Sequence, residues 1–158
     1  MKQETFMMIK PDAYANYSAE KIKDVLKQHG FTIEQEVEID VDMKVMQTLL
    51  MHYQEVIDRL GPSFDFPGKL FQTFYFNGPH TICPMRVSYK HDIIQDSRKL
   101  IGSTNPQQAE EGTIRSMFSD DSYEKADAEH RLIHNCIHAS DSLLNAQKEL
   151  ELWKEYFK

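Results

Sequence analysis

The sequence has few cysteines, no long apolar run and no long basic run. Cys83 and Cys136 are its only cysteines and lie far apart in the chain, which predicts two reduced thiols rather than a disulfide framework. No segment has the pattern of a signal peptide or the length to span a bilayer, so we expect a cytoplasmic protein without membrane contacts. The formal net charge of -7 argues against binding of nucleic-acid polymers, which depends on clustered Lys and Arg.

The composition is that of a globular protein with one hydrophobic core. Hydrophobic residues make up 41% and charged residues 27% of the chain, which is ordinary for such proteins. A length of 158 residues is enough for one domain and short for two. Because no internal repeat or low-complexity linker divides the chain, we expect a single domain over residues 1–158.

Strand-like and helix-like segments are interspersed along the chain. Residues 5–9 form a short apolar run, and residues 31–39 alternate between apolar and polar side chains, so both are expected to be strands. Apolar residues at helical spacing follow Ser18 and Asp42 and return in residues 93–101 and 143–153. This mixture predicts an α+β fold with a largely antiparallel sheet.

The middle of the chain predicts a loop and two further strands. Glycine and proline mark residues 61–68 as a loop, because these residues favour turn conformations. Residues 71–76 and 81–87 are expected to be strands on either side of a turn at residues 77–79. Pro84 has no N–H to donate to a sheet ladder, so the second of these strands is expected at an edge.

A polar, glycine-containing segment runs from Arg98 to Arg115. Guanidinium groups match phosphate oxygens with two parallel N–H donors, and Thr104 adds a hydroxyl between flexible turns. This composition suits a phosphate-binding loop. An exposed loop with two solvated arginines would have the same composition, so the segment alone leaves both interpretations open.

His138 lies within the sequence NCIHASDS, residues 135–142. A neutral imidazole is a competent nucleophile toward phosphorus near neutral pH, although a lone histidine is more often a core or surface residue. His130 and His134 precede it at intervals of four residues. On a continuous helix the three imidazoles would share one face and suit Zn²⁺ or another transition metal, so a metal site is the alternative hypothesis.

Several motifs, in this order, resemble those of the nucleoside diphosphate kinase family. The opening motif is TFMMIKPDA at residues 5–13, and the middle motif is matched by GSTNP at 102–106 and GTIR at 112–115. Residues 135–142 match the signature around the family's phosphorylated histidine. Glu149 and Trp153 lie where the family's last helix has a glutamate and then a tryptophan. The resemblance covers nearly the whole chain and implies a ferredoxin-like sandwich, with helices packed over a four-stranded antiparallel sheet.

The resemblance implies an enzyme that transfers the γ-phosphate of a nucleoside triphosphate to a nucleoside diphosphate through a phosphohistidine, with ping-pong kinetics. His138 would carry the phosphoryl group, Glu149 would hold the imidazole from its other side, and Ser140 would support that glutamate. The other implied site residues are Lys10 at the ribose hydroxyl and phosphates, Asn135 at the sugar, Tyr53 beside the transferred group, and Arg98, Thr104 and Arg115 at the distal phosphates.

The family's base-stacking phenylalanine has two counterparts in this sequence. The loop of residues 61–68 is longer than in the family, so both Phe64 and Phe66 are eligible, and we place Phe64 first. The expected cofactor is Mg²⁺, held through the nucleotide phosphates and without protein ligands. The expected partners are nucleoside di- and triphosphates such as ATP, ADP and GTP, together with further copies of the chain in a homo-oligomer.

The connection between Arg115 and His138 is longer than is usual in the family. Its surplus is polar and acidic, and we expect an inserted surface segment around residues 119–134, because a surface insertion costs little free energy. The insertion leaves the catalytic set intact but changes the rim of the nucleotide cleft. The alternative function is therefore a catalytically weak nucleotide-binding or regulatory protein of the same fold.

Overall fold

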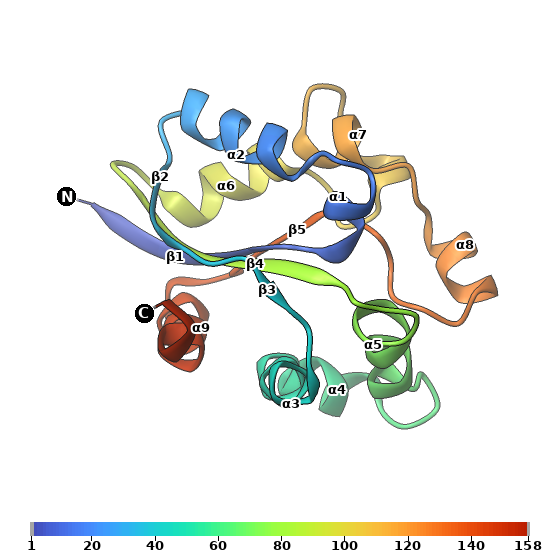
Figure 1. The fold of residues 1–158 in the computed structure, drawn as a ribbon. Helices are drawn as coiled ribbons and strands as arrows, with labels where there is room; N and C mark the ends of the chain where they lie inside the picture. The colour runs from blue at the N-terminus through green and yellow to red at the C-terminus, as the bar shows by residue number, and fades with distance from the viewer. Residues whose placement is uncertain (1, 158) are drawn as a thin grey trace.

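The computed structural model describes residues 2–157 of the chain. An antiparallel sheet crosses the molecule, and helices cover both of its faces (Figure 1). Its strands are ordered β2-β4-β1-β5, and the two-residue strand β3 pairs with β4 as a fifth. The strands are β1 (Gln3–Ile9), β2 (Thr32–Glu36), β3 (Ile39–Asp40), β4 (Thr81–Tyr89) and β5 (Ile137–Ala139).

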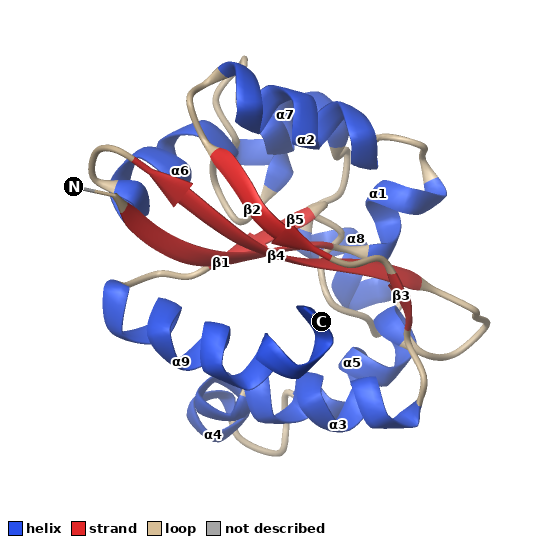
Figure 2. Cartoon of the chain, turned by 60° about the vertical axis from the view of Figure 1, so that its left-hand side comes forward, coloured by secondary structure: helices blue, strands red, loops and turns tan. Residues whose placement is uncertain are grey.

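Two groups of helices enclose the sheet. Helices α1, α2, α6 and α7 lie over one face, whereas α3, α4, α5 and α9 lie over the other (Figures 1 and 2). The helices are α1 (Pro11–Ala15), α2 (Ala19–Gln28), α3 (Met43–His52), α4 (Gln54–Leu60), α5 (Phe66–Phe74), α6 (Ile93–Ile101), α7 (Ile114–Phe118), α8 (Tyr123–Ala128) and α9 (Leu143–Trp153), with 3₁₀ turns η1 (Pro106–Gln108) and η2 (Lys154–Phe157).

Strand β1 contributes to both hydrophobic cores. Because side chains of a strand alternate between the two faces, Met7 and Ile9 belong to the core under α2 and α6, whereas Phe6 and Met8 belong to the core that contains Trp153 of α9. A strand covered on both faces needs apolar residues at successive positions, which explains the uninterrupted apolar run of β1. The α+β, ferredoxin-like sandwich expected from the sequence is confirmed.

The prediction of a strand at residues 71–76 is wrong, because residues 71–74 belong to α5 and residues 75 and 76 form a turn. Phe66, Leu70 and Phe74 recur every four residues and are 7%, 0% and 1% exposed, respectively. They therefore form one buried helical face, and this packing outweighs the preference of aromatic residues for strands. Helix α5 also begins inside the loop expected at residues 61–68, and Asp65 caps it by accepting a hydrogen bond from the Gly68 amide at 3.2 Å.

The edge position expected for the strand containing Pro84 is also wrong. Strand β4 lies between β1 and β2, and Pro84 is opposite Met8 of β1. The Pro84 carbonyl accepts a hydrogen bond from the Val37 amide at 3.3 Å, so the carbonyl and the missing N–H both face the β2 side. Because the missing N–H points away from β1, the proline interrupts no ladder bond to β1. On its other side, β2 has already ended at Glu36.

The two cysteines, Cys83 and Cys136, are free and buried, as expected. Burial raises the pKa of each thiol to about 11, so neither is a thiolate near neutral pH. No helix within residues 2–157 is both long enough and apolar enough to cross a membrane.

Candidate active site

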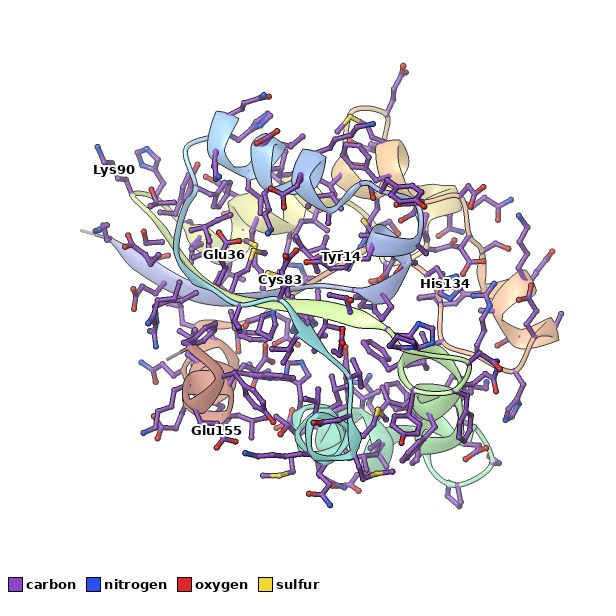
Figure 3. All side chains as sticks on the ribbon, in the orientation of Figure 1. Tyr14, Glu36, Cys83, Lys90, His134 and Glu155 are labelled. Atoms are coloured by element: carbon purple, nitrogen blue, oxygen red, sulfur yellow. The ribbon has the colours of Figure 1, made fainter. Side chains whose placement is uncertain are left out.

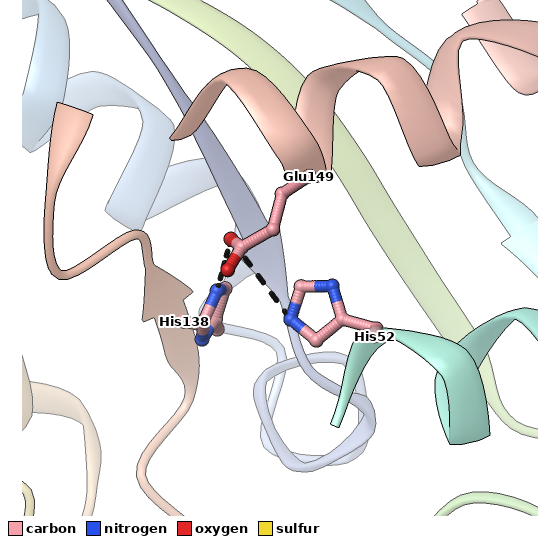
Figure 4. Close-up of side chains that lie close together, drawn as sticks. All are labelled: His52, His138 and Glu149. Carbon is pink, nitrogen blue, oxygen red and sulfur yellow. Dashed lines mark hydrogen bonds and ion pairs between the residues drawn. The ribbon is translucent and has the colours of Figure 1, made fainter. Parts of the chain in front are cut away.

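His138 lies in β5, on the sheet face that α3 and α9 cover. Its Nε2 is 2.9 Å from Oε1 of Glu149, which projects from α9 toward it (Figure 4). An ionised carboxylate only accepts hydrogen bonds, so Nε2 carries the ring hydrogen and Nδ1 keeps its lone pair. Burial, followed by the charges of Lys10 and Arg115, lowers the pKa of His138 to about 3. The imidazole is therefore neutral at physiological pH, with Nδ1 available as a nucleophile.

Glu149 is held by the strand region as well as by its own helix. The Ser140 hydroxyl lies 2.8 Å from Glu149 Oε1 and 3.2 Å from the Phe6 carbonyl oxygen. Burial raises the pKa of Glu149, whereas the neighbouring His52 and the Ser140 hydrogen bond lower it. The sequence placed Ser140 and Glu149 beside the imidazole, and both are there.

Lys10 and Asn135 form a polar pair at the entrance to β5. Lys10 Nζ donates to Asn135 Oδ1 at 2.7 Å, and Asn135 Nδ2 donates to the Thr104 carbonyl at 2.9 Å. Burial, and next the charge of Arg115, lowers the pKa of Lys10 to about 8. The ammonium is consequently less favoured here than in water and would be stabilised by an anionic ligand.

Arg115 is fixed by three backbone carbonyls. Its guanidinium donates to the carbonyls of Asn135 at 3.1 Å, Gly102 at 3.1 Å and Ile137 at 2.6 Å. Neutral carbonyls hold the planar group without cancelling its charge, so the group presents a positively charged face at a defined place. Arg98 and Thr104 are exposed at the rim, and the Thr104 carbonyl is held there by the side-chain amide of Asn135.

Aromatic side chains line the other side of the site. The Tyr53 ring is 6.1 Å from the His138 ring and 5.3 Å from the Phe66 ring, measured between centroids. Burial raises the pKa of Tyr53, so its phenol is protonated. Phe66 is 7% exposed, whereas Phe64 is only partly buried and has the Lys69 Nζ 3.6 Å from its ring centroid.

Nine of the residues expected at the site border one open cleft. The cleft measures about 1510 Å³ and is lined by residues of α4, α5, α6, α8 and α9 and of the segment that leads to β5. The expected residues in its lining are Lys10, Tyr53, Phe64, Arg98, Thr104, Arg115, Asn135, His138 and Glu149. Segments far apart in the sequence therefore bring a nucleophile and several cations to one cavity.

The alternative hypothesis, a metal site made of three histidines on one helix, is wrong. His130 follows α8 with a positive φ of 51° and lies 3.1 Å from Asp65, His134 is in a loop, and His138 is in β5. A chain that passes through a loop and a strand cannot keep the helical spacing, so the three imidazoles do not share a face. Within residues 2–157, the one group with metal-ligand spacing is His52, His138 and Glu149.

Two residues of the site were missed by sequence reasoning. The Asp12 carboxylate accepts a hydrogen bond from the Cys136 amide at 3.0 Å, which fixes the turn before β5, where Cys136 has a φ of 61°. His52 is buried beside both His138 and Glu149 (Figure 4). Asp12 lies within the opening motif and His52 adjoins Tyr53, but no spacing rule connects either to residues more than 80 positions away in the chain.

An α+β sandwich with a neutral histidine and fixed cations around one cleft is suited to an enzyme that transfers phosphoryl groups. The comparisons with known proteins identify its family. Residues 3–157 match the family model described as nucleoside diphosphate kinase. A nucleoside diphosphate kinase of Streptococcus pneumoniae is 33% identical over 152 residues, covering 96% of this chain and 98% of the relative. That of Streptococcus thermophilus is 30% identical over 151 residues, covering 96% and 97%.

Solved structures agree with this assignment. A nucleoside diphosphate kinase of Encephalitozoon cuniculi has a TM-score of 0.75 at 27% identity, covering 99% of each chain. That of Borrelia burgdorferi, solved with vanadate and ADP, has a TM-score of 0.83 at 24% identity, covering 96% of this chain and 86% of its own, and shows the shared fold. This chain belongs to the nucleoside diphosphate kinase family. It is therefore a phosphotransferase with nucleotide substrates, and its family requires a divalent metal ion.

Proposed function

We propose that this chain exchanges phosphate between nucleotides through Nδ1 of His138. The bond between His138 Nε2 and Glu149 Oε1, 2.9 Å long, carries the proposal, because it leaves Nδ1 with its lone pair. That nitrogen belongs to a side chain lining the cleft that Lys10 and Arg115 also line. A neutral nucleophile beside fixed cations is suited to attack on an anionic phosphate.

The reaction proceeds in two balanced half-reactions. Nδ1 of His138 attacks the γ-phosphorus of a nucleoside triphosphate, an N–P bond forms, and the bond to the β–γ bridging oxygen breaks. The nucleoside diphosphate leaves, and the positive charge on the imidazole is balanced by Glu149 on the Nε2 side. A second nucleoside diphosphate then attacks the phosphorus with a terminal β-phosphate oxygen, and the N–P bond breaks. The histidine returns to its neutral form, which gives ping-pong kinetics.

The cations of the cleft stabilise the transferred group. Phosphoryl transfer spreads negative charge over the equatorial oxygens, so catalysis consists mainly of positioning and electrostatic stabilisation. Lys10 and Arg115 are held at fixed positions for this purpose, whereas Arg98 and the Thr104 hydroxyl reach the distal phosphates from the rim. Tyr53, as a neutral phenol, donates a hydrogen bond beside the phosphoryl group.

The donors at the phosphate end fit Mg²⁺ bound through the nucleotide. Lys10, Arg98 and Arg115 are cations and cannot coordinate a metal ion, while the nearby Asp12 carboxylate is occupied by the Cys136 amide. Magnesium in phosphate-transfer sites keeps several waters and is bound mainly through substrate phosphates. When bound, Mg²⁺ would supply neutralisation of the phosphate charge.

The base would stack on Phe64 at the opening of the cleft. Phe64 lines the cleft and is partly buried, whereas Phe66 packs its ring against Tyr53 with a centroid distance of 5.3 Å. A ring that is only 7% exposed offers less free face to a ligand than the partly exposed ring of Phe64. Stacking on a phenyl face accepts any base, so we expect broad nucleotide use.

Three further features are part of the proposal. Residues 1–158 form one domain, and residues 119–134 are inserted into the family's architecture. The chain assembles as a homo-oligomer, in line with the exposure of Leu143 and Leu144 at 48% and 61% on α9. Light scattering coupled to size exclusion would test the assembly. A measured mass of 18.5 kDa, the mass of one chain, would contradict it.

A labelling experiment tests the proposed activity. Incubation with ATP carrying a labelled γ-phosphate should place an acid-labile, alkali-stable label on the protein, and adding GDP should move it to GTP. His138→Ala should abolish both steps, whereas the control His134→Ala should retain the label. Nucleotide binding without any phosphoenzyme would instead support the catalytically weak or regulatory alternative.

A further inference from the structure

The imidazole of His52 contains a buried nitrogen without a partner. His52 is the last residue of α3, and its side chain is 1% exposed. Its Nε2 makes no hydrogen bond within the described chain and points toward Glu149, 4.0 Å from Oε1 (Figure 4). A buried polar group without a partner is costly and uncommon. A nitrogen in this state that faces the Glu149 carboxylate therefore indicates a functional role.

Trp153 determines which nitrogen of His52 carries the hydrogen. The indole Nε1–H is 3.0 Å from His52 Nδ1, and an indole nitrogen can only donate. Nδ1 must therefore accept, and in the neutral ring the hydrogen lies on Nε2. Burial, and next the electrostatic influence of the His138 ring, lowers the pKa of His52 to about 3. The ring is consequently neutral and presents an N–H to Glu149.

This arrangement of hydrogens disfavours a metal ion at the same place. The ligand atoms of His52, His138 and Glu149 lie within 4.8 Å of one another, a spacing compatible with a zinc ion. A metal on both Nε2 atoms would displace both ring hydrogens to Nδ1. At His52 the hydrogen on Nδ1 would face the indole N–H of Trp153. The hydrogen bond between these two side chains would be lost, and two donors would point at each other.

We propose that His52 is a positioning residue for phosphoryl transfer, with its Nε2–H restraining the carboxylate of Glu149 behind His138. This inference rests on the proposed function. When Nδ1 attacks phosphorus, the His138 ring gains positive charge, and Glu149 must stay ionised and aligned to balance it. The Ser140 hydroxyl holds the carboxylate from one side at 2.8 Å. The N–H of His52 approaches from another element, and a shift of about 1 Å would bring it within hydrogen-bond distance.

Two other charged groups near this centre, Lys10 and Asp141, do not compete with His52 as hydrogen-bond partners of Glu149. Lys10, across the site, influences both histidines, whereas Asp141 acts on Glu149 and His138 as a further negative charge. Neither forms a hydrogen bond with Glu149. The His52 ring also meets the His138 ring edge-on at a centroid distance of 4.6 Å, so it fixes the orientation of the nucleophile as well.

Two substitutions of His52 separate positioning from packing. His52→Leu keeps an apolar side chain of similar bulk without an N–H, whereas His52→Gln can place an amide N–H near the position of Nε2. We expect kcat to fall by about tenfold or more in the leucine variant, the scale of losing an orienting hydrogen bond behind an active-site ligand. KM for nucleotides should stay near its original value, and the glutamine variant should recover most of kcat. The control His91→Leu, on the exposed surface, should leave kcat unchanged.

A spectroscopic measurement tests the inference without activity. Nitrogen NMR of the wild-type histidine rings should show His52 as the neutral Nε2–H form, and Trp153→Phe should weaken that preference. An Nδ1–H form of His52 in the wild type, or equal losses of kcat in the leucine and glutamine variants together with lowered stability, would overturn the inference. Stoichiometric Zn²⁺ binding that His52→Leu abolishes would overturn it in favour of a metal site. Absence of any phosphoenzyme in the wild type would refute the proposed function, whereas the NMR result would still report on His52.

Discussion

The catalytic centre and the 119–134 segment are built in different ways. The centre joins β1, β5, α3 and α9, and its contacts link residues as far apart in the chain as Phe6 and Ser140. The 119–134 segment contains only one short helix, α8, and half of its residues are exposed. The centre is therefore held by the sheet and both cores, whereas the segment depends on a few local contacts.

Those few contacts attach the segment to the cleft rim. The Asp121 carboxylate binds Arg131 at 2.6 and 3.1 Å, and the two side chains are 5% and 10% exposed. His130 lies 3.1 Å from Asp65, and the Leu132 amide donates to the Thr73 hydroxyl at 2.9 Å. Since Asp65 and Thr73 belong to the turn and helix beside Phe64, the segment restrains the part of the cleft assigned to the base.

The difference between the two regions predicts two kinds of functional effect. Changes at the catalytic centre should lower kcat, because they disturb groups that act on the transferred phosphoryl. Changes in the 119–134 segment should mainly raise KM, because they loosen the rim while the nucleophile stays in place. Single substitutions with matched controls in each region test this division.

Glu149→Ala should have the largest effect. Without the carboxylate, the Nε2–H of His138 loses its acceptor and the developing positive charge is no longer balanced. We expect kcat to fall about a hundredfold, the scale of removing an orienting partner or an acid–base group. Steady-state kinetics should show little change in KM. The control Glu151→Ala lies on the same helix with its side chain 71% exposed and should leave kcat intact; equal losses in both variants would contradict a specific role.

The sequence predicted the centre better than its surroundings. The resemblance proposed His138 and Lys10 from long, specific motifs and Glu149 from its place in the last helix, and the structure brings all three residues to one cleft. The segment 71–76 was misread because aromatic residues favour strands, and only the packed structure shows that Phe66 and Phe74 face one core. The contact between His52 and Trp153 was not predicted, since tertiary packing alone brings these residues together.

At alkaline pH, kcat/KM should decrease as Lys10 loses its proton. Its pKa in the free protein is about 8, so kcat/KM should fall as pH rises through about 8, approaching a tenfold loss per pH unit as one required proton is lost. A bound triphosphate stabilises the ammonium, so the fall in kcat at saturation should lie at higher pH. Lys10→Arg keeps its charge and should lose this alkaline limb. An unchanged limb in that variant would assign it to another group.

On the acid side, the free energy of unfolding should decrease at a higher pH than the one at which His138 becomes protonated in the folded protein. The folded-state pKa values of His52 and His138 are each about 3, below the ordinary value of about 6.5 for histidine. The unfolded chain therefore binds more protons between these pH values, and stability is present above about pH 6.5 and is lost as pH falls toward 3. Denaturant titrations from pH 7 to pH 4 should show this decline, and a constant free energy of unfolding would contradict the depressed pKa values.

Asp121→Asn should affect the rim and leave the chemistry unchanged. The amide keeps the shape of the side chain but removes the charge that faces the buried Arg131, so we expect a loss of about 2 kcal/mol in the free energy of unfolding. KM for nucleotides should rise about fivefold, equivalent to about 1 kcal/mol, while kcat is retained. Asp120→Asn, at an exposed neighbouring position, is the matched control. A large fall in kcat for Asp121→Asn would refute the division between centre and rim.

Lys69→Met should have the smallest effect and is the sharpest test of the base site. Lys69 Nζ lies 3.6 Å from the centroid of Phe64 and 3.7 Å from Asp127 in α8, so it links the segment to this ring. Methionine keeps the apolar volume but removes the cation–π contact, which is worth about 0.5–1 kcal/mol. If Phe64 carries the base, KM should rise about twofold for every nucleotide, because 0.5 kcal/mol corresponds to that factor, and kcat should not change. Lys125→Met, exposed on α8, should leave KM unchanged. The contrary result would be an unaltered KM in Lys69→Met together with a raised KM in Phe66→Leu but not in Phe64→Leu. It would assign base stacking to Phe66 and would show that the 119–134 segment does not affect nucleotide binding.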